Sequence, residues 1–202
     1  MGDSLTLRGA RKRRDIVEVA AEILRESGPA SVSMRNAARR SGASLSAMTY
    51  YFVNAEELLE EAGRVNIAMW AERAERVAER VETEPPPVGR DRAIELVLSA
   101  TLPAQAPLLG HYLQLVAAGS STPVARAYAT GRARLNQAVG RVLAVVGIRI
   151  PAEVIIAIVD GAAVTALSEG RDVVTTARSL LEQALELCEG AAGPAPQEGS
   201  RP

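Results

Sequence analysis

The sequence has one cysteine, Cys188, and one histidine, His111, among its 202 residues. This excludes an internal disulfide and the Cys- and His-rich sets that hold zinc. Aromatic residues make up only 3% of the chain. The longest apolar stretch, 154–167, is too short to cross a bilayer and contains Asp160. Paired-carboxylate motifs, Ser–His–Asp or Cys–His arrangements and glycine-rich phosphate loops are also lacking, so we expect no enzyme and no metal or cofactor site.

The composition is that of a folded helical protein, with 48% hydrophobic and 23% charged residues and many Ala, Arg, Glu, Val and Leu. No alternating strand pattern of useful length occurs, so we predict an all-α fold. The basic N-terminus has no apolar segment of the secretory type. We therefore expect a soluble, cytoplasmic protein with no membrane contact.

Charge is distributed unevenly, although the net charge is only −1. Residues 1–53 hold nine basic and five acidic side chains, whereas the remainder holds 14 basic and 19 acidic ones. A basic head on an acidic body is typical of a polyanion-binding module attached to a different domain. Short segments also acquire such imbalances by chance, so the asymmetry alone leaves both interpretations open.

The N-terminal region predicts an arm and a first helix. Residues 1–14 end in four consecutive basic residues and show no apolar period, which predicts a flexible basic arm. Asp15 and Glu18 match the capping box that starts a helix. Gly28-Pro29 then stops this helix.

Three further helices have suitable N-caps, at Ser33, Ser44 and Asn54. Gly42 is suited to the left-handed residue that ends the second helix at about Ser41. The fourth helix, which starts after Asn54, is predicted to run to about Thr83.

The start of the fourth helix carries two more signals. Glu57 completes its capping box, and Val53 and Leu58 are spaced as a hydrophobic staple. Further helices are predicted near residues 90–102, 107–119, 123–147, 151–170 and 173–189. The tail from Gly190 is rich in Gly, Pro and Ala, which predicts disorder.

The stretch from Ser33 to Leu59, SMRNAARRSGASLSAMTYYFVNAEELL, carries the functional signal. Two short helices separated by a glycine-containing turn form the helix-turn-helix pattern, whose second helix enters the major groove of DNA. Ala37-Ala38 and Met48 are suited to hold these helices against the first one. Three of the six aromatic residues occur together as Tyr50-Tyr51-Phe52. Phe52 suits a small core, and a tyrosine hydroxyl can donate to a phosphate oxygen.

These residues resemble the DNA-binding head of the TetR family of transcriptional regulators over about residues 14–60. Family members usually have tyrosine at the position of Thr49, lysine at that of Ala55 and glycine at that of Ser46. Loss of a lysine–phosphate contact weakens DNA binding and flattens its salt dependence by roughly one charge, which basic residues 11–14 are placed to offset. The matching pieces are Ala38, Ser41-Gly42-Ala43-Ser44, Tyr50-Tyr51-Phe52 and Asn54 through Leu59.

The resemblance implies a division of the chain into a flexible arm (1–14), a three-helix DNA-binding head (15–53), an effector-binding and dimerisation domain (54–189) and a disordered tail (190–202). Leu45, Ser46 and Tyr50 are expected to read bases. The caps Ser33, Ser44 and Asn54 would also be chosen with no DNA present, so that alternative stays open. The full set of DNA contacts implied by the resemblance is Ser33, Arg35, Ser44, Leu45, Ser46, Thr49, Tyr50, Tyr51 and Asn54.

In this family the middle helices enclose an inducer pocket, and ligand entry moves the fourth helix. Few polar side chains are expected around this pocket, which favours a mainly apolar or aromatic effector. A structural role for His111 or for Asp160 remains an alternative. The resemblance implies a lining of Trp70, Met69, His111, Tyr112, Leu115, Tyr128, Asn136 and Thr165.

The predicted helices 151–170 and 173–189 are apolar on more than one face, which indicates burial on more than one side. In TetR-like proteins the last two long helices pair with their counterparts in a dimer, so we predict a twofold homodimer. A larger core within one chain is the alternative. The residues expected at the dimer contact are Ile155, Ile158, Val159, Ala162, Leu180, Leu181 and Ala184.

The sequence thus predicts a TetR-like transcriptional regulator, a repressor that a small-molecule effector releases from a palindromic operator in double-stranded DNA. The alternatives are a helical small-molecule-binding protein and a protein-interaction module that has lost specific DNA binding. Thr49 and Ala55 motivate the last alternative, whereas Tyr50-Tyr51 and the basic arm speak against it.

Overall fold

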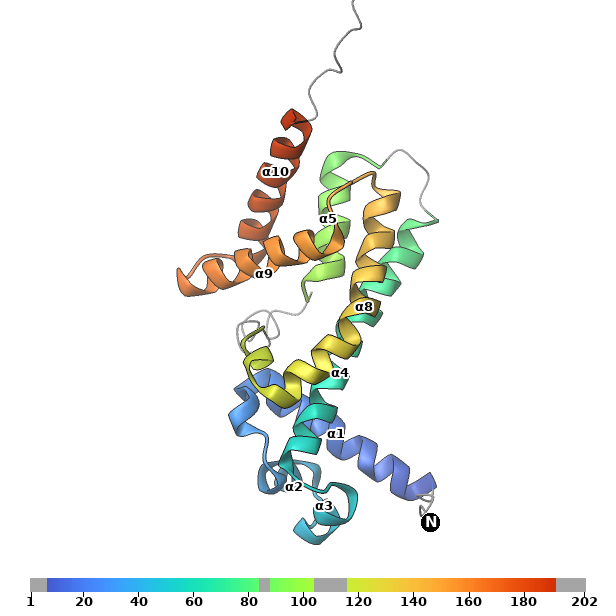
Figure 1. Cartoon of the computed structure of the whole chain (residues 1–202), viewed down its shortest axis with the longest axis vertical. Helices are drawn as coiled ribbons and strands as arrows, with labels where there is room; N and C mark the ends of the chain where they lie inside the picture. Colours follow the sequence, from blue (N-terminus) through green and yellow to red (C-terminus); the bar gives the residue numbers. More distant parts are fainter. Residues whose placement is uncertain (1–6, 84–87, 104–115, 192–202) are drawn as a thin grey trace, which may run out of the picture.

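The computed structural model describes residues 7–83, 88–103 and 116–191, and these form helices without a β-strand. Figure 1 shows α1, α2 and α3 at one end of the molecule and α10 at the other, with α4 and α8 side by side between them. The predicted all-α fold is confirmed. The helices are α1 (Leu7–Ser27), α2 (Met34–Ser41), α3 (Leu45–Tyr51), α4 (Ala55–Val81), α5 (Arg90–Thr101), α8 (Thr122–Val145), α9 (Ala152–Ser168) and α10 (Val173–Ala191), with short 3-10 helices at Pro29–Ser31 and Ala118–Ser120.

Helix α1 begins at Leu7 and not at Asp15. The prediction of a flexible arm is therefore wrong for residues 7–14, which are helical, and two of their five basic side chains have partners in the head. Lys12 Nζ donates to the Ser41 carbonyl at 3.2 Å, and the Arg13 guanidinium lies over the Phe52 ring. The capping-box pattern at Asp15 falls inside the helix, and residues 1–6 lie outside the described residues.

The three later caps are confirmed. The side-chain oxygens of Ser33, Ser44 and Asn54 each accept a hydrogen bond from the backbone N–H three residues on, at 3.2, 3.1 and 2.9 Å. Gly42 follows α2 with φ 63°, the left-handed conformation that favours glycine. These caps fix the short turn that separates α2 from α3.

At the start of α4, Glu57 bonds to the residue before the cap in place of the cap Asn54 that a capping box requires, and the hydrophobic staple does not form. Glu57 accepts a hydrogen bond from the Val53 N–H at 2.7 Å. The Val53 side chain is 90% exposed, whereas Leu58 is buried. Phe52 packs in the same cluster as Leu58 and takes the core position that the staple assigned to Val53.

Two hydrophobic clusters hold the fold together. The head cluster combines buried side chains of α1, α2, α3 and the start of α4 with Ala118 and Val124. The body cluster begins at Ile67 on α4 and includes buried side chains of α5, α8, α9 and α10. Helix α4 thus contributes to both clusters, and among the described side chains only Tyr128 is partly buried against both.

Helices α4 and α8 cross closely because small residues face each other. A Cβ added at Gly131 of α8 would lie 2.5 Å from Ile67 Cγ2, and one added at Gly63 of α4 would lie 3.0 Å from the Ala127 Cβ. Outside this contact, arginines of α8 pair with glutamates of α4 at 2.8, 2.7 and 2.8 Å. These pairs are Arg126–Glu60, Arg134–Glu75 and Arg141–Glu82.

The predicted helix at 107–119 falls mostly outside the described residues, as does the predicted tail beyond residue 191. No helix in the described part of the chain is long and apolar enough to span a membrane.

Candidate nucleic-acid interface and ligand cavity

One face of helix α3 packs against the head cluster, and the opposite face is exposed to solvent. Met48 and the following Phe52 are buried in the head cluster. Leu45 and Tyr50 are 52% and 69% exposed, and Ser46 is exposed with them. The three residues expected to read bases therefore all point away from the core.

The two tyrosines of α3 differ in exposure. Tyr50 and Tyr51 form an edge-to-face pair with ring centroids 5.1 Å apart. Tyr51 is half-buried and packs against the head cluster, so it supports the exposed Tyr50 ring. Thr49 is exposed, and its hydroxyl donates to the Ser46 carbonyl at 3.0 Å.

The remaining predicted contacts lie at the same end of the molecule, on α2, the turn before α3 and the start of α4 (Figure 1). Arg35, Ser44 and Asn54 are exposed, and Ser33 is half-buried. The side chains of Ser33, Ser44 and Asn54 serve as caps, which is the structural role that their residue types predict. The structure thus brings all nine predicted residues to the end formed by α2 and α3.

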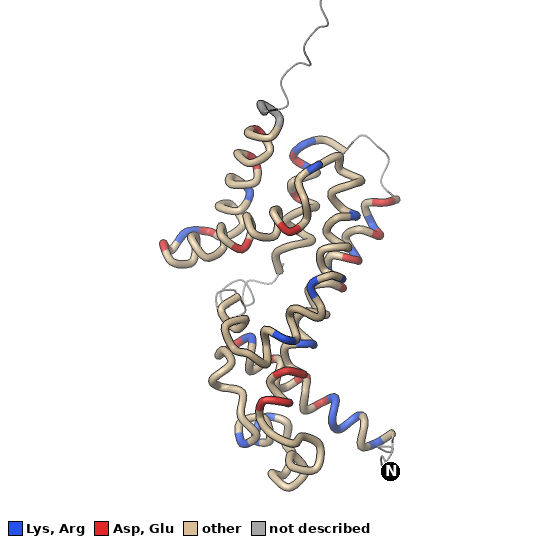
Figure 2. Tube along the Cα trace, viewed as in Figure 1, with Lys and Arg blue, Asp and Glu red and all other residues tan. Residues whose placement is uncertain are grey.

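The basic residues of α1 fall into two groups. Lys12 and Arg13 are engaged within the head, whereas Arg8, Arg11 and Arg14 are exposed. Figure 2 shows basic positions along the first turns of α1. In place of a flexible arm, the protein holds these three cations on a rigid helix. Cations fixed in this way suit contact with a phosphate backbone.

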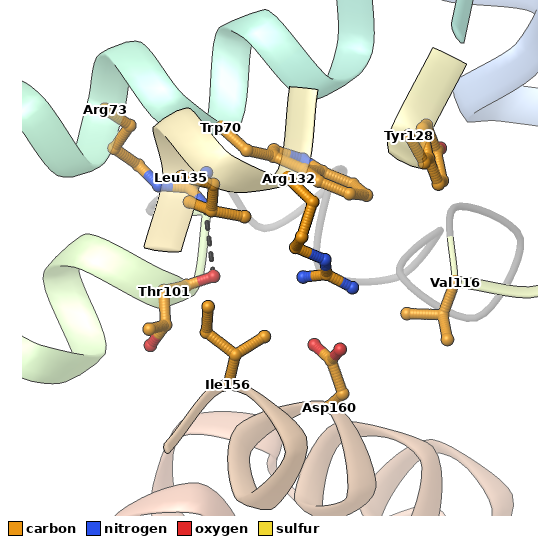
Figure 3. Close-up of a pocket in the computed structure, with 9 residues that line it drawn as sticks. All are labelled: Trp70, Arg73, Thr101, Val116, Tyr128, Arg132, Leu135, Ile156 and Asp160. Carbon is orange, nitrogen blue, oxygen red and sulfur yellow. Dashed lines mark hydrogen bonds between the residues drawn. The ribbon is translucent and has the colours of Figure 1, made fainter. Parts of the chain in front are cut away.

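A second candidate site is a small, partly open cavity of about 60 Å³ between the helices of the body. Figure 3 shows side chains from α4, α5, α8 and α9 around it, with the guanidinium of Arg132 and the carboxylate of Asp160 pointing toward each other. Arg73 Nη2 donates to the Thr101 carbonyl at 3.0 Å on its wall. The lining residues are Trp70, Arg73, Thr101, Val116, Tyr128, Arg132, Leu135, Ile156 and Asp160.

The aromatic part of this lining is the pair Trp70 and Tyr128, with ring centroids 5.3 Å apart and planes inclined by 51°. Burial raises the pKa of the Tyr128 hydroxyl far above its usual value. The positive charges of Arg132 and Arg25 oppose this rise in the pKa. Tyr128 is therefore a neutral hydrogen-bonding group at physiological pH.

The structure places the predicted effector residues in different surroundings. Trp70 and Tyr128 line the cavity, and Asn136 lies in an adjoining groove together with Arg132 and Asp160. Met69 and Thr165 are half-buried and do not line this cavity. His111, Tyr112 and Leu115 lie outside the described residues.

Sequence reasoning missed much of the polar lining. Arg73 follows Trp70 by three residues and Arg132 follows Tyr128 by four, so helical spacing from the two aromatic residues would have found them. Asp160 was considered as a ligand-orienting or a structural residue, and the structure places it at the cavity. The cavity lining is thus more polar than expected from the prediction of a mainly apolar or aromatic effector.

Most predicted dimer contacts are already buried within one chain. Ile155, Val159, Ala162 and Leu181 belong to the body cluster. Ile158 and Ala184 are half-buried, and Leu180 is exposed. The predicted homodimer, if formed through α9 and α10, therefore needs the opposite faces of these helices.

Within the described part of the chain, no group of three or more His, Cys, Asp or Glu side chains is arranged to hold a metal ion. No curated protein sequence matches the chain. The family model described as bacterial regulatory proteins of the tetR family matches residues 16–62.

Solved structures with the same fold include three with TM-scores above 0.6. A protein from Saccharomonospora viridis, described as a transcriptional regulator and solved in complex with choline, has a TM-score of 0.65 at 20% identity, over 88% of this chain and 96% of its own. A protein from Mesorhizobium loti, described as a TetR-family transcriptional regulator, has a TM-score of 0.65 at 18% identity, over 90% and 98%. The multidrug binding protein EbrR, complexed with imidazole, has a TM-score of 0.61 at 21% identity, over 93% and 97%.

The match to the family model covers α2, α3 and the start of α4, together with most of α1, where the anchored recognition helix and its caps are found. The similar structures extend the shared fold to the helices of the body. Residues 16–62 accordingly form a DNA-binding head of the tetR type, and the whole chain has the all-α fold of the similar structures.

Proposed function

We propose that the protein is a repressor that binds a palindromic operator as a homodimer and leaves it when a small molecule occupies the cavity of the body. The observation that carries this proposal is the presentation of α3. Met48 and Phe52 hold the helix on the head cluster, while Leu45, Ser46 and Tyr50 extend outward. Such a helix fits the major groove of DNA. Because a regulator acts where the DNA is, we also propose a cytoplasmic location.

Dimerisation follows from the size of the head. A single three-helix head buries too few contacts for operator-level affinity, and a twofold dimer matches a palindrome. The outer face of α9 offers a stripe of small and apolar residues at helical spacing, Val154, Ala157, Gly161 and Val164, all exposed. We propose that this stripe and the exposed Leu180 and Leu187 of α10 form the dimer interface in place of the buried residues named above.

The cavity supports an effector with two chemical parts. Trp70 and Tyr128 offer aromatic surface to an apolar or aromatic group, and Arg132 and Asp160 offer charged partners to a polar end. Two proteins of the same fold were solved with the small organic molecules choline and imidazole. We propose a small amphipathic organic molecule.

Release from DNA then requires the effector to favour one arrangement of the two heads. Heads of a dimer reach successive major grooves only at a spacing of roughly 34–36 Å. A ligand that binds better to a dimer with another spacing shifts the population away from the DNA-binding form. Helix α4, which belongs to both clusters, connects the cavity to the head.

The test is selection of duplexes from a random DNA library by the full-length protein, in parallel with Tyr50→Ala and Tyr50→Phe. We expect the native protein to enrich a palindrome and Tyr50→Ala to lose it, because the ring is exposed on the recognition helix. Tyr50→Phe separates the contribution of the hydroxyl from that of the ring. Binding that is salt-sensitive but indifferent to sequence would contradict the proposal and favour a module that has lost its operator through Thr49 and Ala55.

A further inference from the structure

The head and the connecting helix share a buried polar contact. Arg25 Nη1 of α1 donates to Asn66 Oδ1 of α4 at 2.6 Å, and Asn66 Nδ2 lies 3.5 Å from the Ala21 carbonyl. Asn66 is fully buried. A charge-assisted hydrogen bond in such surroundings is strong, and loss of one partner leaves the other unsatisfied. The contact therefore fixes the position of α1 relative to α4.

This contact lies one helical turn from the cavity. Trp70 follows Asn66 by four residues on α4, so the two side chains lie on the same side of the helix. The Trp70 ring lines the cavity and contacts Tyr128 of α8. The positive charge of Arg25 in turn opposes the rise that burial causes in the pKa of the Tyr128 hydroxyl.

Tyr128 occupies the junction of the two hydrophobic clusters. Its ring packs against the body cluster and the head cluster, and it lies 3.8 Å from where a Cβ on Gly119 would be. The neighbouring Ala118 and Val124 belong to the head cluster. Since protein interiors are close-packed, a ring shared by two clusters cannot move without displacing side chains of both.

We propose that Tyr128 is the positioning residue that couples the cavity to the DNA-binding head, with the Arg25–Asn66 contact as its connection to α1. The inference rests on the proposed function, because it describes how occupation of the cavity reaches DNA. A ligand beside Trp70 moves the Tyr128 ring, and the ring shifts the contact between α1 and α4. Linkage is reciprocal, so DNA bound at the head changes the surroundings of Trp70 by the same route.

Reciprocity allows a test without the natural effector. Trp70 is the only tryptophan of the chain, so its fluorescence reports on the cavity alone. The probe is the duplex enriched from the random library, titrated into the full-length protein. We expect Trp70 emission to change with the same midpoint as DNA binding, which the anisotropy of a labelled duplex measures independently.

Two pairs of variants locate the coupling. Tyr128→Leu removes the shared ring and Arg25→Met removes the connection to Asn66. Both are expected to bind the duplex but to lose the change in Trp70 emission. Tyr128→Phe keeps the ring, and Arg171→Met changes an exposed arginine after α9. Both of these are expected to retain the full change. Circular dichroism verifies that each variant is folded.

The outcomes separate this inference from the function on which it rests. If the native protein enriches no duplex, both the proposed function and the coupling are contradicted. If the native protein binds DNA but Trp70 emission stays constant, the coupling is contradicted and the proposed function is not. If Tyr128→Leu and Arg25→Met both keep the full change in Trp70 emission on DNA binding, Tyr128 is not the coupling residue. If Tyr128→Leu fails to fold, Arg25→Met alone decides between these results.

Discussion

The guanidinium of Arg13 lies over the Phe52 ring, 4.9 Å from its centroid. Arg13 belongs to the first turns of α1, and Phe52 closes the helix-turn-helix at the end of α3. The same guanidinium is 3.2 Å from a Glu57 carboxylate oxygen and 3.5 Å from one of Glu61, both on α4. One side chain thus joins α1, the core of the recognition unit and the connecting helix.

Arg13→Met is expected to lower the free energy of unfolding by about 1–2 kcal/mol. The loss combines a cation–π contact of about 0.5–1 kcal/mol with partly exposed ion pairs of about 0.2–1 kcal/mol each. Urea unfolding followed by circular dichroism measures it. Arg14→Met, one residue on and exposed, is the control and should change stability by no more than about 0.5 kcal/mol. Equal effects of the two substitutions would contradict a structural role for Arg13.

The exposed cations of α1 predict a specific change in DNA binding. Replacing Arg8, Arg11 and Arg14 together with glutamine is expected to weaken binding to every duplex and to lower the salt slope by up to about 2.7, at roughly 0.9 for each phosphate contact. The preferred sequence should stay the same, because phosphate contacts carry no base information. Titration at several salt concentrations measures the slope. An unchanged slope would show that these turns of α1 lie away from DNA. The matched control replaces the body arginines Arg90, Arg149 and Arg171, which are exposed far from the head.

Two glycines of α8 predict opposite effects of the same substitution. Gly131→Ala would place a Cβ 2.5 Å from Ile67 Cγ2 and is expected to lower stability by about 1–3 kcal/mol through overpacking. At Gly140 nothing lies within 4 Å of an added Cβ, so Gly140→Ala is expected to raise stability by about 0.5–1 kcal/mol through helix propensity. Thermal and urea unfolding compare the two.

The cause of the Gly131 effect can be checked with a second substitution. Ile67→Ala removes the two nearest atoms that the new Cβ would meet, Cγ2 at 2.5 Å and Cγ1 at 2.7 Å, so it should make Gly131→Ala less damaging than it is alone. Strict additivity of the two changes would contradict a clash between α4 and α8 at this point.

The arginine–glutamate pairs between α4 and α8 predict an acid-sensitive contact. The hydrogen bond from Arg134 holds the pKa of Glu75 below its ordinary value of 4.5, and Arg141 does the same for the pKa of Glu82. A pKa lowered in the folded state means that stabilisation is present above the ordinary value and is lost as pH falls through the folded value. Glu75→Gln should therefore lower stability at neutral pH, and its difference from the native protein should shrink below about pH 4.5.

Urea unfolding at a series of pH values measures this difference. Glu56→Gln, which removes an exposed carboxylate away from the arginines of α8, is the control for the substitution itself. A difference for Glu75→Gln that is constant from neutral to acid pH would rule out the ion pair as its source.

The outer faces of α9 and α10 predict the oligomeric state. Val164→Glu places a charge in the proposed interface and is expected to convert the dimer into a monomer in sedimentation analysis. Val174 is similarly exposed, 39% against 38% for Val164, but lies beside a different groove formed with α4 and α5. Val174→Glu should leave the dimer intact. Dissociation by both substitutions, or by neither, would contradict the assigned face.

Local signals were enough to predict most of the head. Ser33, Ser44 and Asn54 are caps that act within four residues, and Met48 and Phe52 are the apolar side chains of a short polar helix. The start of α1 was predicted wrongly because it depends on distant partners. Lys12 reaches Ser41 and Arg13 reaches Phe52, and neither contact has a signature in residues 7–14.

The body was harder to predict because its side chains have no local signature. Trp70 and Tyr128 were found as aromatic residues on the correct helices. Arg132, on a helix with several exposed arginines, is indistinguishable in sequence from a solvated arginine until α9 is packed opposite. The same ambiguity affects α9, where apolar residues surround the helix and only the packed structure separates Val159, in the core, from Val164, at the surface.

The separation of the two hydrophobic clusters has a consequence for the evolution of such a protein. Because the head cluster and the cavity share only Tyr128 among the described side chains, most cavity residues can be exchanged without changing the packing that presents α3. New effector preferences can therefore arise on an unchanged operator, and new operators can be adopted without loss of the effector. Tyr128 packs against both clusters, so a substitution at this residue affects the cavity and the packing of the head together.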